Sequence, residues 1–129
     1  MDKFEEILRI LHREKSWPVH RTGDGQWEIT VPCMDGRSQP VYATPGVDRE
    51  KDAIVRIWSV IGEHSDVKDP VKLLELNAAL SYGACAYDGE KVILKHTHLV
   101  RDADVTELGK SINYIGNKAP ELRRDLIKS

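Results

Sequence analysis

The feature that most constrains this sequence is an apolar run at residues 53–61, which reads Ala-Ile-Val-Arg-Ile-Trp-Ser-Val-Ile. β-Branched and aromatic residues dominate the run, and such residues are enriched in strands. Successive side chains of a strand point to opposite faces of a sheet, and here apolar residues occupy both sets of positions. The run therefore predicts a central strand that is covered on both faces. The rest of the chain has to supply the neighbouring strands and the surfaces that cover them.

Residues 1–31 predict one helix and two strands. Residues 2–14 carry apolar side chains at helical spacing with charged residues between them, and Asp2 is a suitable N-cap. A Thr-Gly-Asp-Gly turn separates a short edge segment at Val19–Arg21 from an alternating strand at Trp27–Val31. In that strand the odd-numbered residues are apolar, and we expect them to face the core.

Proline residues mark two further elements. Pro40 and Pro45 enclose Val41–Thr44, and because proline lacks a backbone donor we expect a short strand near a sheet edge. Asp followed by Pro at residues 69–70 is a typical helix start, and the apolar residues that follow as far as position 80 leave no polar face. A helix of this kind is normally buried, either in the core or between subunits.

The C-terminal part of the chain predicts a hairpin and a last helix. Asp88-Gly89 is the strongest hairpin signal in the sequence, and it connects strands at Tyr82–Tyr87 and Lys91–Leu99. Asp104 and the glutamate three residues later form a capping box in front of a helix. We expect Pro120 to kink or restart this helix, because proline removes a backbone hydrogen bond. The core-facing stripe of the helix is Val105, Leu108, Ile112 and Ile115.

The order of these elements is α-β-β-β-(β)-α-β-β-α. It predicts an α+β fold in which helices pack on an antiparallel β-sheet, with a single domain over residues 1–129. Hydrophobic residues make up 40% of the chain and charged residues 31%, a balance that is typical of a folded globular protein. No internal repeat, linker or low-complexity tract indicates a second domain.

Charge and hydropathy exclude several classes of function. The formal net charge of -2 provides no general attraction for nucleic acid or for anionic lipid. No stretch approaches the roughly 18 uncharged apolar residues of a membrane span, and Met1–Glu6 lacks the apolar core of a signal peptide. Cys33 and Cys85 lie outside any C-x-x-C pair, which favours a reducing compartment. We therefore expect a cytoplasmic protein that binds neither nucleic acid nor membrane.

Histidine and cysteine residues offer the alternative of a small enzyme or a metal-binding protein. His96 and His98 lie two positions apart on a predicted strand, so both side chains face the same way and are candidate metal ligands. Cys33, Cys85 and His64 are candidate further ligands, but their spacing does not enforce convergence. Cys85 lies among small residues of a predicted strand, as inert buried cysteines do. We predict no catalytic residue, no metal and no cofactor.

The stretch from Leu73 to Leu99, LLELNAALSYGACAYDGEKVILKHTHL, resembles YbjN-like and type III secretion chaperone-like (CesT-like) proteins. The shared pattern is an L-x-x-L-N helix, a small-residue strand after a Tyr-Gly step, an acidic-glycine turn and a strand of long apolar residues. The residues that carry it are Leu73, Leu76, Asn77, Tyr82, Gly83, Asp88, Gly89 and Val92 to Leu94. The resemblance implies a small bacterial homodimer that binds an extended segment of a partner protein, without a catalytic site or cofactor.

From the residues and the resemblance together we predict a non-catalytic protein-binding module that works as a homodimer. The partner polypeptide is expected to lie against the first helix, at Phe4, Ile7, Leu8 and Leu11. The apolar residues make more hydrophobic surface than one sheet with two amphipathic helices readily covers, so a symmetric dimer is expected to bury the excess. The expected dimer residues are Trp58, Leu73, Leu76, Leu80 and Tyr82. A regulatory protein with the same fold and no secretion client is the alternative.

Overall fold

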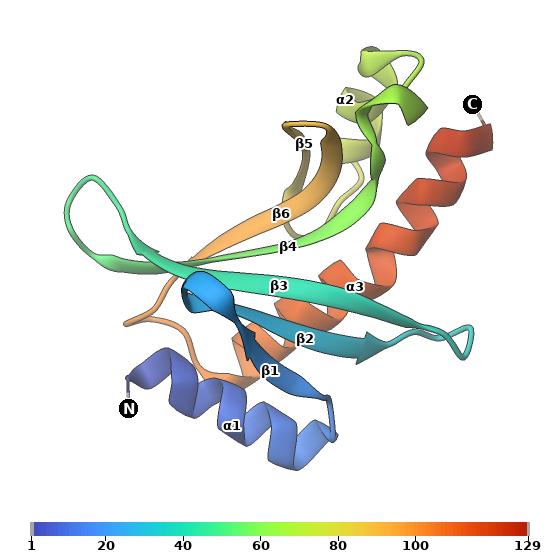
Figure 1. Ribbon diagram of the computed structural model, residues 1–129. Helices are drawn as coiled ribbons and strands as arrows, with labels where there is room; N and C mark the ends of the chain where they lie inside the picture. Colours follow the sequence, from blue (N-terminus) through green and yellow to red (C-terminus); the bar gives the residue numbers. More distant parts are fainter. Residues whose placement is uncertain (1, 129) are drawn as a thin grey trace.

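The computed structural model describes residues 2–128, which form one antiparallel sheet with two long helices on the same face (Figure 1). The helices are α1 (Lys3–Lys15), the short α2 (Pro70–Asn77) and α3 (Val105–Lys128). The strands are β1 (Val19–Thr22), β2 (Gln26–Pro32), β3 (Ser38–Val47), β4 (Ala53–Glu63), β5 (Ala84–Asp88) and β6 (Lys91–Leu99). They lie in the order β1-β2-β3-β4-β6-β5 across the sheet. The predicted α+β fold with an antiparallel sheet is confirmed.

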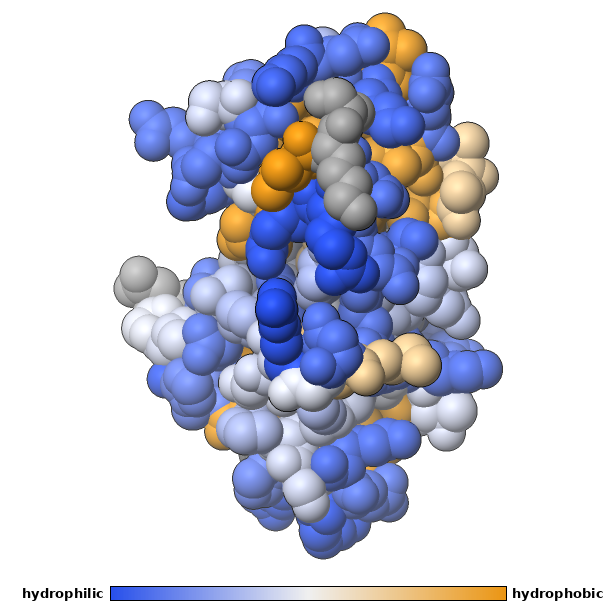
Figure 2. Space-filling model, turned by 90° about the vertical axis from the view of Figure 1, so that its right-hand side faces the viewer, coloured by the Kyte–Doolittle hydropathy of each residue, from blue (hydrophilic) through white to orange (hydrophobic). Residues whose placement is uncertain are grey.

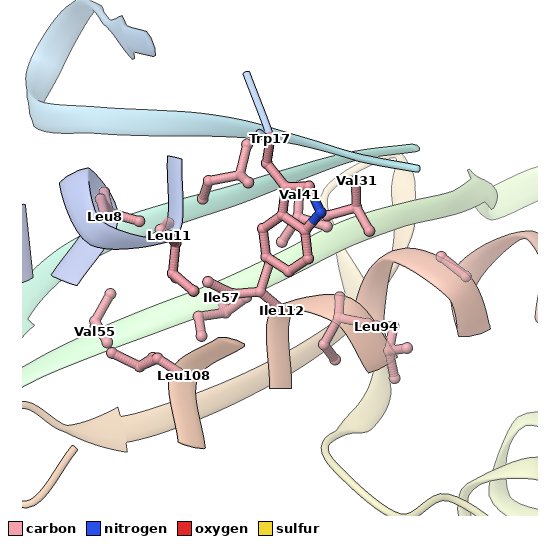
Figure 3. Close-up of a cluster of buried hydrophobic side chains, with 14 of the residues drawn as sticks. Leu8, Leu11, Trp17, Val31, Val41, Val55, Ile57, Leu94, Leu108 and Ile112 are labelled. Atoms are coloured by element: carbon pink, nitrogen blue, oxygen red, sulfur yellow. The ribbon is translucent and has the colours of Figure 1, made fainter. Parts of the chain in front are cut away.

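The core lies between the sheet and the helices α1 and α3. Alternate residues of the strands, such as Val31, Val41 and Ile57, point toward the helices and are fully buried. Figure 3 shows these side chains meeting Leu8 and Leu11 from α1 and Leu108 and Ile112 from α3. The predicted amphipathic stripes of both helices are therefore used to cover one face of the sheet.

The apolar run at residues 53–61 does form a central strand, β4, which pairs with β3 on one side and with β6 on the other. The prediction that both faces of this strand are covered is wrong. Val55, Ile57 and Ser59 are buried under the helices, whereas Arg56 is exposed and Trp58 is partly exposed on the opposite face. The chain has helices for one face of the sheet and leaves the other without them.

Strand β3 differs most from its prediction. It spans Ser38–Val47 and lies inside the sheet between β2 and β4, so it is neither short nor near an edge. Both prolines are within the strand, where Pro40 is opposite Thr30 and Pro45 is opposite Val55. Each proline removes one backbone donor from the ladder, but its carbonyl remains. The carbonyl of Pro40 accepts a hydrogen bond from the buried hydroxyl of Ser59 at 2.7 Å.

Helix α2 is shorter and more exposed than the sequence predicts. It begins after the Asp69 cap, whose carboxylate accepts the backbone N–H of Val71 at 3.0 Å, and it ends at Asn77. Within it Leu73 is buried, while Val71 and Leu74 remain 54% and 68% exposed. The expectation of a helix that is buried all round is therefore wrong for the single chain.

Helix α3 continues through Pro120 without the predicted restart. A proline inside a helix leaves the carbonyl four residues earlier without its N–H partner, and here that carbonyl belongs to Gly116. The thiol of Cys33 lies 3.4 Å from this carbonyl oxygen and donates to it. Burial and the nearby carboxylate of Asp35 raise the pKa of the Cys33 thiol, so the proton is retained for this bond. A side chain of the β2–β3 turn thus replaces the hydrogen bond that Pro120 removes.

No helix in residues 2–128 is both long enough and apolar enough to cross a membrane.

Candidate protein-binding surface

The face of the sheet that lies away from α1 and α3 is the first candidate site, and we call it the open sheet face. Its central residues are Tyr42, Ile54, Arg56, Trp58, Ile93 and Lys95, placed by the register of β3, β4 and β6. Ile54 and Ile93 are 6% and 7% exposed, yet neither belongs to the core cluster under the helices. The face that has no helix therefore carries buried apolar side chains of its own, at separate positions along β4 and β6.

An aromatic pair forms the centre of the open sheet face. Tyr42 and Trp58 are directly opposite each other on β3 and β4, and their rings stack at a centroid distance of 5.5 Å. Beside them is a hollow of about 330 Å³, lined by Thr44, Arg56, Trp58, Ala86, Tyr87, Asp88, Ile93 and Lys95. Partly exposed aromatic side chains next to a hollow are typical anchors of protein–protein interfaces.

The hollow has cations on its rim. Arg56 and Lys95 are exposed and form no ion pair within the part of the chain that the structure describes. Glu28 lies near Tyr42 but is engaged by His20, whose Nε2 is 3.1 Å from its carboxylate. Burial, with Glu28 as the second cause, raises the pKa of Tyr42 and keeps this phenol neutral. The hollow is therefore lined by apolar side chains together with two cations and the carboxylate of Asp88.

A second exposed apolar surface lies on α2. Val71 and Leu74 are three residues apart and point away from the core, and we call them the α2 patch. Figure 2 shows hydrophobic surface gathering at one end of the molecule, where α2 and the C-terminal end of α3 lie in Figure 1. Asn77 anchors the helix to the sheet, since its Oδ1 accepts the backbone N–H of Cys85 at 2.7 Å. The patch is therefore presented on a fixed helix.

The residues predicted to bind a partner through the first helix are core residues in the structure. Phe4, Ile7, Leu8 and Leu11 are between 1% and 4% exposed, because α1 packs this side of its surface on the sheet and α3. The exposed side of α1 carries charged residues such as Glu6, Arg9 and Arg13. Direct contact of the four apolar side chains with a partner stays a prediction, and it requires α1 to leave this position.

The five residues predicted for a dimer interface are not brought together on one surface. Leu73 is buried in the core, and Leu76 and Leu80 pack against that core from its margin. Trp58 lies on the open sheet face, whereas the ring of Tyr82 contacts Tyr114 of α3 on the helix-covered side. Their role in a dimer stays a prediction, because the structure contains one chain.

The histidine and cysteine candidates do not converge on an ion. Among the residues that the structure describes, no group of three or more His, Cys, Asp or Glu side chains lies close enough to hold a metal. His96 and His98 are neighbours, with ring centroids 4.7 Å apart. The Nε2 atom of His98 is hydrogen-bonded to the hydroxyl of Ser111 at 2.8 Å, so this nitrogen already has a partner. Burial raises the pKa of Cys85 to about 11, so its thiol is protonated near neutral pH and is a poor nucleophile.

Sequence reasoning missed the residues that make the two exposed surfaces. Arg56 interrupts an otherwise apolar run, and this single charge was the available signal that one face of β4 meets solvent. Tyr42 and Lys95 join Trp58 through strand pairing, which the sequence alone does not reveal. On α2 the outward direction of Val71 and Leu74 had no sequence signal, because apolar residues follow one another around that helix.

Comparison with known proteins identifies a fold for this chain. No family model matches the sequence, and no curated protein matches it. A chain of the solved HopA1–SchA chaperone–effector complex has a similar structure, with a TM-score of 0.66 at 10% sequence identity. The similarity covers 98% of this chain and 94% of that chain. The likeness confirms the chaperone-like fold, and at this identity it shows the fold alone; the YbjN-like part of the resemblance stays a prediction.

Proposed function

We propose that this chain is a non-catalytic, chaperone-like module that binds a segment of a partner polypeptide on its open sheet face. The observation that carries the proposal is the hollow on a sheet face that has no helix, lined by Trp58 and Ile93 and bordered by the stacked ring of Tyr42. The fold shared with a chain of a chaperone–effector complex supports it. The cytoplasmic location of the protein stays a prediction.

The charges on the open sheet face indicate the chemistry of the bound segment. Arg56 and Lys95 flank the hollow beside Trp58, and neither is neutralised within the described residues. A segment with apolar residues that enter the hollow and with carboxylates on either side complements this surface. We therefore assign Trp58 to the proposed partner site instead of to the dimer interface for which it was predicted.

The proposal is tested with an array of short peptides that vary apolar and acidic content. We expect the protein to retain peptides with apolar residues flanked by Asp or Glu, and Trp58→Ala to lose most of this binding. The double variant Arg56→Glu/Lys95→Glu is expected to prefer basic flanks instead, and Arg13→Glu on the exposed side of α1 is the matched control. Equal binding by the protein and by both open-face variants would refute the proposal.

We further propose that the chain forms a homodimer through the α2 patch. Val71 and Leu74 are large apolar side chains that remain more than half exposed on a helix held in place by its cap and by Asn77. In a two-fold symmetric contact the same patch of each copy faces the other. Two apolar patches can pack together, so the α2 patch suits a contact of this kind. This leaves the open sheet face available for the partner.

Sedimentation velocity over a range of concentrations tests the dimer. We expect a concentration-dependent dimer that is lost in Val71→Ser/Leu74→Ser. The matched control is Met34→Ser, which removes a 98% exposed apolar side chain from the distant β2–β3 turn and should leave the dimer unchanged. A chain that sediments as a monomer at all concentrations would exclude the dimer and leave the partner site untouched.

A further inference from the structure

Two histidines on β6 lie under α3 and belong to neither exposed surface. His96 and His98 are two positions apart on the strand and point to the same face, and their rings meet nearly at a right angle. The Nε2 atom of His98 lies 2.8 Å from the hydroxyl of Ser111 on α3. The pair therefore occupies the contact between the sheet and its longest helix.

His96 of this pair also contacts the segment that leads from α2 into β5. The ring of Tyr82 meets His96 at 5.8 Å and Tyr114 at 5.3 Å, in both cases edge to face. Beside it, the hydroxyl of Tyr114 accepts the backbone N–H of Ser81 at 2.9 Å. Gly83 then runs directly over β6, where an added Cβ would lie 2.4 Å from the carbonyl oxygen of Lys95. Residues 81–83 are thus fastened to β6 and α3 at one point.

The surroundings of the pair disfavour positive charge. Both histidines are half-buried, and the residues opposite them on β4 are the apolar Val55 and Ile57. Burial lowers the pKa of both imidazoles below the ordinary value, and the neighbouring ring of His98 lowers the pKa of His96 further. The half-buried site therefore favours the neutral form of both rings.

The other titratable groups near the pair offer no carboxylate in contact with it. The segment 81–83 contributes the phenol of Tyr82, and α3 contributes the phenol of Tyr114. Lys110 of α3 lines the same groove as these two tyrosines, and Glu107, one turn before Ser111, is exposed. Lys95 belongs to the opposite face of β6. Protonation of the histidines would therefore add positive charge without a partner beside it.

We propose that His96, His98, Tyr82 and Tyr114 form an acid-sensitive latch, in which proton uptake by the two histidines releases residues 81–83, and with them α2, from the sheet. Two imidazolium rings with centroids 4.7 Å apart repel each other in a half-buried site, and water has to enter to screen them. The segment 81–83 lies against His96 through the ring of Tyr82 and the backbone of Gly83, so displacement of the segment opens this ring to water. The α2 patch lies on the helix that precedes this segment. Acid therefore also loosens the attachment of the patch to the sheet.

The sign of the effect follows from the direction of the pKa shifts. Histidines with a lowered pKa in the folded state bind fewer protons there than in the opened state. The latch is therefore closed above the ordinary histidine pKa of about 6.5 and weakens as the pH falls through and below it.

Amide hydrogen exchange of residues 78–88 at pH 7.5 and pH 5.5, corrected for intrinsic exchange rates, tests the latch in the full chain. On going from pH 7.5 to pH 5.5, we expect the equilibrium constant for opening of this segment to rise. The rise is up to about tenfold for each unit by which the pKa of a histidine is lowered. The variant His96→Phe/His98→Gln keeps a ring beside Tyr82 and a polar group beside Ser111, and it should lose this pH dependence. His20→Gln, which alters the exposed pair with Glu28, should keep it.

Imidazole titration by NMR in the unaltered protein provides a second measurement that does not depend on a variant folding. Titration midpoints of His96 and His98 below the ordinary histidine pKa of about 6.5 support the latch. Midpoints at or above this value would overturn it. Segment exchange that does not change between the two pH values, or that changes equally in the double variant, would also overturn it.

Discussion

The two faces of the sheet are formed by the same strands, but helices cover only one of them. Trp17 and Trp58 show the contrast between a covered and a partly exposed side chain. Trp17 is 4% exposed and packs with the core residues under α1 and α3. Trp58 lies on the open sheet face, where it stacks on Tyr42 and borders a hollow lined with two cations. Within β4 the buried Ile57 and the partly exposed Trp58 are adjacent in sequence.

The difference shows where stability and function are separated in this fold. Side chains on the covered face are enclosed by two helices, so the hydrophobic contribution to folding is concentrated there. Side chains on the open sheet face have neighbours within the sheet but no layer above them. Those that remain partly exposed, such as Trp58, can therefore be changed at lower cost to folding, and this makes them suitable for recognition of a partner.

Removal of the tryptophan on the covered face should have the largest effect on stability. We expect Trp17→Ala to lower the free energy of unfolding by about 3–5 kcal/mol, because it leaves a cavity among residues that cannot all close around it. Urea unfolding followed by circular dichroism measures the change. A loss below about 1 kcal/mol would mean that the covered face is not the principal core.

Close packing on the covered face is tested by the glycines of α3. A Cβ at Gly116 would lie 2.8 and 2.9 Å from Cβ and Cγ1 of Val31, atoms that the β2 backbone holds in place. At Gly109 the nearest atom is the flexible end of Leu11, at 3.0 Å. We therefore expect Gly116→Ala to destabilise by about 1–3 kcal/mol and Gly109→Ala to cost less. Equal effects would show that α3 shifts on the sheet as readily at one position as at the other.

Much of the fold was accessible from local sequence signals. Asp2 caps α1 by accepting the N–H of Glu5, as its position suggested, and Gly89 takes the positive φ of the hairpin turn. Asp104 caps α3 by accepting the N–H of Glu107 at 2.7 Å. Signals of this kind depend on residues close together in the chain, which is why they can be recognised without a structure.

The features that the sequence did not reveal depend on residues far apart in the chain. Helix α3 passes through Pro120 because Cys33, more than eighty positions earlier, donates to the carbonyl of Gly116. Strand β3 tolerates Pro40 inside the sheet, with Ser59 of β4 donating to its carbonyl. The open sheet face escaped prediction for the same reason. Whether helices cover one face or both is decided by the packing of the whole chain.

The matching change on the open sheet face should have the smallest effect on stability. We expect Trp58→Ala to lower the free energy of unfolding by about 0.5–1.5 kcal/mol, roughly the contribution of an aromatic pair, because the chain forms no layer above it. The same urea titration measures this change beside Trp17→Ala, so the two tryptophans act as controls for each other. If Trp58→Ala destabilised the isolated chain as much as Trp17→Ala, the open sheet face would be a second core, and its aromatic pair would be explained by folding instead of by partner recognition. If the cost is small while peptide binding is lost, then the exposed tryptophan serves recognition, because stability does not account for an aromatic side chain at this position.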